Sequence, residues 1–392
     1  MNASRANSIK RWAGFCFAAA CVLFAVGQDG TLSHAQQSLS QWKLGKAAGQ
    51  GSYVGQGECA KCHAKIAARY AQSGMARALA PAGECETLRA YAPFAFTLHG
   101  FTYRIERLGE QFNYTVSRGN ESVTTPLLWC FGHGASGHTF VVRHESVYYE
   151  TRVSYFTQLA GLDVTPGAPR EAPASVKAAL GQPQRHAEMQ GCFTCHSTPG
   201  AGTFVVTLEQ FTPGLHCEAC HGPGSAHVAQ AAQTTLTKAG NARRVKQTIF
   251  NPSRWSPDDV NQQFCGACHR SWESVMQMPD RGGEANVRFQ PYRLANSKCY
   301  QNPDDRRISC IACHDPHAPL SHEAATYDAK CLACHQSGSV ALKKGRAAPA
   351  CSAGKQQDCA ACHMPKIEPE GLHFKFTDHW IRIVKAGDEY PR

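Results

Sequence analysis

Hydrophobic and polar positions change their periodicity several times along the chain. An apolar run at 12–27 follows three basic residues and is too short for a comfortable membrane span, and small residues stand at 33–35. These features predict a signal peptide over 1–35 with cleavage before Gln36, the alternative being an uncleaved anchor. Residues 64–80 are rich in alanine with few helix breakers, which predicts a helix.

The middle of the chain alternates aromatic and polar side chains, which is typical of antiparallel strands. Residues 96–108 and 111–117 alternate on either side of Gly109, which predicts a hairpin, and 118–122 reads as a turn. Residues 137–156 predict a second hairpin. After these strands the pattern predicts a proline-rich linker, followed by short helices and long loops.

Cysteine is the unusual feature of the composition, with 20 residues among 392. Fourteen of them stand in seven Cys-x-x-Cys-His motifs, which is the attachment signature of haem c. Two thiols bond to the porphyrin edge, and the histidine that follows binds the iron. Zinc knuckles, a thioredoxin-like pair or a disulfide framework would not require histidine after every second cysteine. The expected attachment thiols are Cys59, Cys62, Cys192, Cys195, Cys217, Cys220, Cys265, Cys268, Cys310, Cys313, Cys331, Cys334, Cys359 and Cys362, and the expected proximal ligands are His63, His196, His221, His269, His314, His335 and His363.

The first motif stands apart in the sequence from the other six, which predicts how the chain is organised. We expect a mostly irregular and helical multihaem cytochrome c with a small antiparallel β insert, in which the haems form the core. The expected parts are a signal peptide at 1–35, an N-terminal segment with the first motif at 36–90, a β-rich insert at 91–165 and a six-motif region at 174–392.

Several stretches together resemble a known family. They are "YVGQGECAKCHAKIAARYAQSGMARAL", "LHCEACHGPGSAH", "CGACHR", "CIACHDPH" and "CHMPK…FTDHWIRIV". They resemble bacterial multihaem c-type cytochromes related to the tetrahaem cytochrome that accepts electrons from hydroxylamine oxidoreductase. Relatives often carry tetratricopeptide repeats, and none follows here. The resemblance implies an exported electron-transfer protein.

Each haem iron has a sixth position, and histidine there gives a low-potential electron-transfer haem. His317 lies three residues after His314, too close to reach the other face of the same haem, so it should serve a neighbour. His227, which follows a Gly-Pro-Gly bend, could do the same. The further candidate sixth ligands are His373 and His379 beyond the last motif, His216 before Cys217, His99 in the strand-rich part, and Met75 for the first haem.

Four cysteines outside both the motifs and the signal peptide are available for disulfides: Cys85, Cys130, Cys299 and Cys351. One or two disulfides are expected, with Cys299–Cys351 the favoured pair, and free buried thiols are the alternative.

The sequence therefore predicts an exported or periplasmic heptahaem cytochrome that passes electrons between redox partners, which are other redox proteins or a membrane quinol or cytochrome complex. The alternative is a multihaem reductase of small nitrogen or sulfur oxyanions with one open iron site. The formal charge of +10 would be largely offset by haem propionates, so no nucleic-acid partner is expected. No integral membrane span is expected once the signal is removed.

Overall fold

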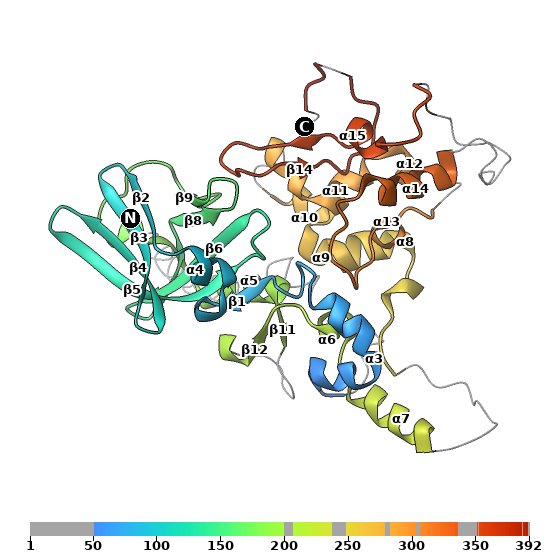
Figure 1. Ribbon diagram of the computed structural model, residues 1–392, viewed down its shortest axis with the longest axis horizontal. Coiled ribbons are helices and arrows are strands. Elements are labelled where there is room, and N and C mark those ends of the chain that lie inside the picture. Colours follow the sequence, from blue (N-terminus) through green and yellow to red (C-terminus); the bar gives the residue numbers. More distant parts are fainter. Residues whose placement is uncertain are drawn as a thin grey trace, which may run out of the picture.

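The computed structural model describes residues 51–199, 207–236, 248–278, 283–302, 306–335, 351, 353–385 and 387–390. The expected signal peptide lies outside these residues. The chain forms two parts, which Figure 1 shows beside each other. The β lobe spans residues 79–184, and the motif region comprises helix α3 (Gln56–Tyr70) together with the described residues from 186 onward.

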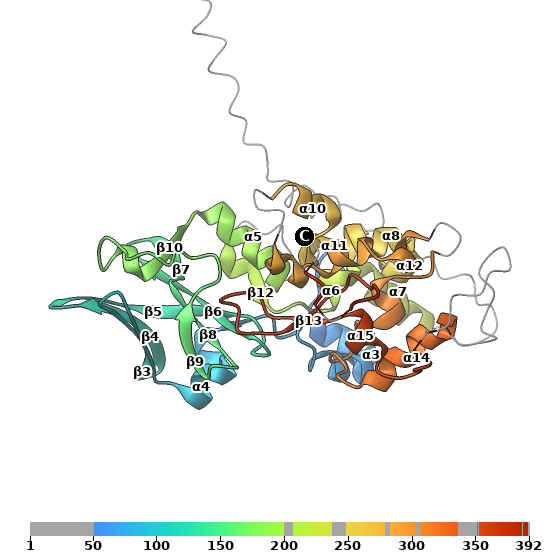
Figure 2. The ribbon, with the colours of Figure 1, turned by 90° about the horizontal axis from the view of Figure 1, so that it is seen from above.

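The β lobe is built on one curled antiparallel sheet of ten strands. The sheet runs in the order β10-β7-β6-β5-β4-β3-β2, with β1 pairing β5, and with β8 pairing both β6 and β9. The curl of the sheet is clearest in Figure 2. Its strands are β1 (Leu79–Pro81), β2 (Phe94–Leu98), β3 (Phe101–Leu108), β4 (Gln111–Arg118), β5 (Glu121–Phe131), β6 (Gly137–His144), β7 (Val147–Thr151), β8 (Val153–Phe156), β9 (Gly161–Val164) and β10 (Gly181–Gln184).

This lobe has a hydrophobic core of its own. Alternate side chains of β3 point inward, so Phe101, Tyr103 and Ile105 are fully buried, and Tyr114 and Phe140 join them from β4 and β6. The predicted fold class was therefore wrong. The β part is a large sheet and not a small insert, and side chains rather than haems fill its core.

The predicted hairpins and turn are confirmed, and the predicted end of one helix is wrong. The hairpin at Gly109 is confirmed, because β3 and β4 pair around it and Gly109 has a φ of 63°. The turn after β4 and the hairpin of β6 and β7 are also confirmed. The helix predicted over 64–80 ends earlier, at Tyr70, because Leu79 pairs with Phe131 of the sheet. Tertiary pairing there overrides helix propensity.

The motif region consists of short helices joined by irregular segments. The helix α3 lies beside α6 and α7 although the whole β lobe separates them in sequence (Figure 1). Two short hairpins, β11 (Ser197–Pro199) with β12 (Phe211–Pro213) and β13 (Lys366–Ile367) with β14 (Phe376–Thr377), complete this part. The helices from α4 onward are α4 (Glu86–Tyr91, in the β lobe), α5 (His186–His196), α6 (Cys217–His221), α7 (Ser225–Leu236), α8 (Pro257–Asp259), the π-helix η5 (Val260–Cys265), α9 (Gly266–His269), α10 (Trp272–Met276), α11 (Gln290–Ala295), α12 (Lys298–Gln301), α13 (Cys310–Cys313), α14 (Ala324–His335) and α15 (Cys359–His363).

No helix within the described ranges is both long enough and apolar enough to cross a membrane.

Candidate haem-binding sites

Every Cys-x-x-Cys pair lies on a helical turn. The first motif lies within α3, the second and sixth end α5 and α14, and the third and seventh make up α6 and α15. The fourth spans the junction of η5 and α9, and the two cysteines of the fifth are the ends of α13, with His314 directly after it. One helical turn places both thiols on the same side, which the two-point attachment of a porphyrin requires.

Three motif histidines are each faced by a second histidine from elsewhere in the chain. Two imidazoles on opposite faces of one metal ion, each with a metal–nitrogen bond of about 2.0 Å, have ring centroids about 6 Å apart. The observed separations are compatible with this spacing, so these three pairs are the candidates for holding an iron ion from both sides. The pairs are His63 and His227 at 6.4 Å, His221 and His317 at 5.9 Å, and His314 and His379 at 6.2 Å.

Hydrogen bonds to Nδ1 leave Nε2 available in four of the expected iron ligands. Iron-binding histidines usually donate Nδ1–H to a carbonyl, which fixes the ring and directs Nε2 at the metal. Four rings show this arrangement: His196 Nδ1 lies 3.1 Å from the carbonyl oxygen of Ala78, His221 Nδ1 2.8 Å from that of Phe250, His363 Nδ1 2.8 Å from that of Arg382, and His379 Nδ1 3.0 Å from that of Thr377.

Burial also favours the neutral imidazole that a metal needs. It lowers the pKa of His196, His221, His269 and His314. Burial, together with the neighbouring His314, lowers the pKa of His379 to about 4. These rings are therefore uncharged at neutral pH and able to bind iron.

Other predicted ligands have different surroundings. Both ring nitrogens of His216 are hydrogen-bonded, to Gln56 Oε1 at 2.6 Å and to the Pro213 carbonyl at 3.1 Å. His99 Nε2 lies 2.9 Å from the carbonyl oxygen of Arg170. His373 Nε2 lies 2.7 Å from Asp163 Oδ2 of β9.

Met75 was expected at the first haem, opposite His63. The ring of His227, another expected sixth ligand, lies near the His63 ring, with 20° between the planes. Which of the two residues binds the first iron stays a prediction. Met75 lies at the turn before β1, where its carbonyl accepts hydrogen bonds from Leu215 N and Ala78 N. The Met75 backbone thus links the segment after the first motif to the segment before the third.

Attachment thiols of different motifs lie side by side. Burial, together with the neighbouring Cys217 thiol, raises the pKa of Cys59 to about 11. Burial, with Cys265 and Cys217 next in effect, raises the pKa of Cys220 to about 12. Three pairs of neighbouring thiols bring motifs together: Cys59 lies near Cys217, Cys265 near Cys310, and Cys331 near Cys359.

A buried polar side chain ties each of these three motif pairs together. Glu218 of the third motif accepts hydrogen bonds from Val54 N and Gly55 N, at the start of the helix that carries the first motif. Asn261 before the fourth motif accepts from Cys310 N at 2.8 Å. Asp328 before the sixth motif accepts from Asp358 N and Cys359 N, both at 2.8 Å. Sequence analysis missed all three residues, since no spacing rule marks them.

A buried ion pair supports His379. Arg293 Nε and a terminal nitrogen of Arg293 each lie 2.9 Å from an oxygen of Asp378, and both side chains are at most 1% exposed. Arg382 adds a contact to Asp378 at 2.6 Å. Burial alone would raise the pKa of Asp378, but hydrogen bonds from Arg293, Trp380 N and Arg382 outweigh it and hold the pKa below its usual value.

The second motif lies against the β lobe. Phe131 of β5 contacts the ring of His196 at 5.3 Å and that of Phe193 at 5.7 Å. Trp129 packs on Phe193 at 4.8 Å. Cys195 Sγ is 4.0 Å from the Ala267 carbonyl, so this motif also adjoins the fourth.

The spare cysteines do not pair as favoured from the sequence. All four are free thiols in the structure, and among them Cys85 Sγ and Cys130 Sγ are 2.7 Å apart. Cys299 lies near the attachment thiols Cys313 and Cys334, and Cys351 is exposed.

One comparison with known proteins, the match to a family model, agrees with a haem protein. The family model of cytochrome c554 and c-prime matches residues 166–222, which contain the second and third motifs. The crystal structure of outer cell wall cytochrome OcwA is similar over 85% of this chain and 80% of its own, with 14% identity and a TM-score of 0.40, which is too low to assign a shared fold. No curated protein matches the chain.

The family match and the motif geometry indicate a c-type cytochrome, which binds haem covalently and transfers electrons with redox partners. The match supports the expected resemblance at this level. It does not extend to hydroxylamine oxidoreductase as a partner.

Proposed function

We propose that this protein is an exported cytochrome that binds seven haem c groups and passes electrons along a chain of closely spaced, mostly bis-histidine haems. Its partners would be other redox proteins or a membrane quinol or cytochrome complex. The observation that carries the proposal is the facing of motif histidines by distant histidines at iron-binding separation, with His221 and His317 at 5.9 Å the most nearly parallel pair. Bound haem iron would supply one-electron chemistry, and the residues of this chain hold and orient it.

The spacing of the motifs supports electron transfer. The first motif adjoins the third through Cys59 and Cys217, and the third adjoins the fourth through Cys220 and Cys265. The fourth and fifth meet at Cys265 and Cys310. The sixth and seventh meet at Cys331 and Cys359, and Cys331 also lies near Cys313 of the fifth. Groups attached at these thiols would form one connected series.

The second motif would form a branch of this series, beside the β lobe. It adjoins the fourth motif and packs on Phe131 of the sheet. A partner that docks on the β lobe would therefore meet the haem of Cys192 and Cys195 first. The sheet gives that haem a rigid support.

The proposal is tested on the full chain made in a host that attaches haem c. Haem and iron should be found at seven per polypeptide, and peptide mapping should find every motif modified. Low-temperature EPR of the ferric protein should show low-spin iron, and carbon monoxide should leave the spectrum of the reduced protein unchanged. A high-spin iron that binds carbon monoxide would favour the alternative function, a reductase with an open site.

A further inference from the structure

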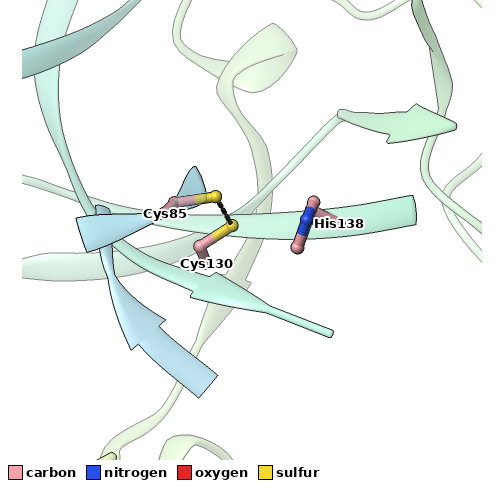
Figure 3. Close-up of side chains that lie close together, drawn as sticks. All are labelled: Cys85, Cys130 and His138. Carbon is pink, nitrogen blue, oxygen red and sulfur yellow. Dashed lines mark hydrogen bonds between the residues drawn. The ribbon is translucent and has the colours of Figure 1, made fainter. Parts of the chain in front are cut away.

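Two buried cysteines of the β lobe and a histidine form a cluster outside all seven motifs. Cys85 precedes α4, and Cys130 lies on β5, where it pairs with Ala80 of β1. Figure 3 shows the two sulfurs directed at each other with His138 beyond them. The side chains are 2%, 1% and 8% exposed, and their ligand atoms all lie within 4.8 Å of one another.

We infer that Cys85 and Cys130 form a disulfide that joins the segment carrying η1 (Ala82–Glu84) and α4 to the sheet strand β5. Their sulfurs are 2.7 Å apart, which brings them close to bonding. Disulfides persist in proteins that leave the cytoplasm, and this chain is expected to be exported. The two cysteines are 45 positions apart, and the bond would close a loop that holds α4, β2, β3, β4 and most of β5.

A metal ion is the competing occupant of this cluster. His138 Nδ1 is buried without a hydrogen-bond partner in the described part of the chain, which is what an unfilled ligand would show. However, two thiolates on one tetrahedral zinc ion lie about 3.8 Å apart. The observed separation of the two sulfurs is much shorter, and His138 Nε2 already has Thr87 Oγ1 at 2.9 Å. The geometry therefore favours the sulfur–sulfur bond.

Thiol–disulfide exchange with a disulfide of a thiol oxidase would form the bond. The Cys85 thiolate would attack the oxidant disulfide and form a mixed disulfide, and the Cys130 thiolate would then attack the Cys85 sulfur. In total the two thiols lose two protons and two electrons, and the oxidant leaves as a dithiol.

Burial decides when this exchange takes place. Neither sulfur can be reached by a protein thiol in the folded lobe, because both side chains are at most 2% exposed. The bond must therefore form while the lobe folds, and it stays closed afterwards. It is a permanent link and not a redox switch, and it withdraws two thiols from competition with haem attachment.

The disulfide would also stabilise the strands on which the second motif packs. Trp129 and Phe131 flank Cys130 on β5 and pack on Phe193 of α5. The carbonyl oxygen of Ala78, directly before β1, accepts hydrogen bonds from both His196 Nδ1 and Gly132 N. The disulfide would fix these two strands, and with them the support of this motif.

Alkylation of the purified haem-loaded protein tests the inference. The protein is denatured in the presence of a maleimide and without reductant. Cys85 and Cys130 should then be unlabelled and should appear in one cross-linked peptide. Reduction should make both label fully. Free labelling of both thiols before reduction would overturn the inference.

Two variants separate the disulfide from a metal site. In Cys85→Ser, Cys130 should label without reductant. His138→Ala should keep the cross-linked peptide, because the histidine is no part of the bond. Elemental analysis of the wild-type protein should find no zinc or copper in proportion to the polypeptide. Stoichiometric zinc or copper that His138→Ala loses would overturn the disulfide in favour of a metal site.

Discussion

His317 faces His221 across 5.9 Å, and the two ring planes are within 5° of parallel. The two histidines belong to different motifs, since His317 follows the fifth motif and His221 ends the third. His221 Nδ1 lies 2.8 Å from the Phe250 carbonyl oxygen, which leaves Nε2 as the nitrogen that can bind iron. A single iron ion in this gap would join two haem-binding segments that are distant in sequence.

Replacing His317 should open one iron. In His317→Ala the haem attached at Cys217 and Cys220 would lose its sixth ligand, because no other side chain faces His221 in this way among the described residues. EPR should then show one high-spin iron, and carbon monoxide should bind the reduced protein at about one per polypeptide. The exposed His322, five residues away, is the matched control, and His322→Ala should leave both signals as in the wild type. Unchanged low-spin spectra in His317→Ala would contradict the assignment.

Breaking the buried ion pair should destabilise the support of His379. Asp378→Asn leaves the Arg293 charge buried and unpaired, which typically costs about 3–5 kcal/mol. The haem bound by His314 should also change its spectrum, because Asp378 directly precedes His379. The exposed pair of Arg107 and Glu110 is the control, and Glu110→Gln should cost less than about 1 kcal/mol. Denaturant unfolding measures the free energy of unfolding of both variants. Equal decreases in the two would contradict a larger contribution of the buried pair.

Local chemistry was readable from the sequence, and long-range pairing was not. The Cys-x-x-Cys-His spacing fits within one helical turn, so each motif could be found without a structure. The position of His317 three residues after His314 already excluded ligation of its own haem, and the structure places it opposite His221. Ligation itself stays a prediction.

The size of the sheet and the contacts between motifs could not be predicted from the sequence, for physical reasons. Strands β1 and β10 have three and four residues and each contains proline, so neither has a recognisable alternation. Glu218 looks like an ordinary variable residue of its motif. Its role comes from Val54 and Gly55, which lie more than 160 residues earlier. The contact of Cys85 with Cys130 depends in the same way on the pairing of β1 with β5.

The three buried acceptors between motif pairs should matter for folding and haem loading. Glu218→Gln keeps the shape but loses the charge that holds Val54 N, Gly55 N and Gly224 N, and should cost about 2–3 kcal/mol. Haem occupancy at Cys59 and Cys62 should fall together with that at Cys217 and Cys220, as measured by peptide mass spectrometry. The control is Glu58→Gln on the exposed face of α3, which should change stability by less than about 0.5 kcal/mol. A normal occupancy and stability in Glu218→Gln would remove Glu218 as a link between these motifs.

His138 should make the β lobe sensitive to acid. Burial lowers the pKa of His138 to about 4, whereas the unfolded chain has the ordinary histidine value of about 6.5. Between these values the unfolded state binds a proton that the folded state does not, so stability falls as the pH falls. At 1.36 kcal/mol for each pH unit, the loss should reach about 3 kcal/mol at pH 4, while above pH 6.5 this contribution is complete.

Denaturant unfolding of the ferric protein at several pH values between 7 and 4 measures this dependence. Histidines bound to iron would not titrate in this range, because the metal holds the nitrogen that would take the proton. His138→Gln should therefore flatten the curve, and the exposed control His322→Ala should keep the wild-type slope. If His138→Gln unfolds with the wild-type dependence on pH, the acid sensitivity lies elsewhere. His133, whose pKa is also lowered by desolvation and then by Arg77, is the next residue to replace.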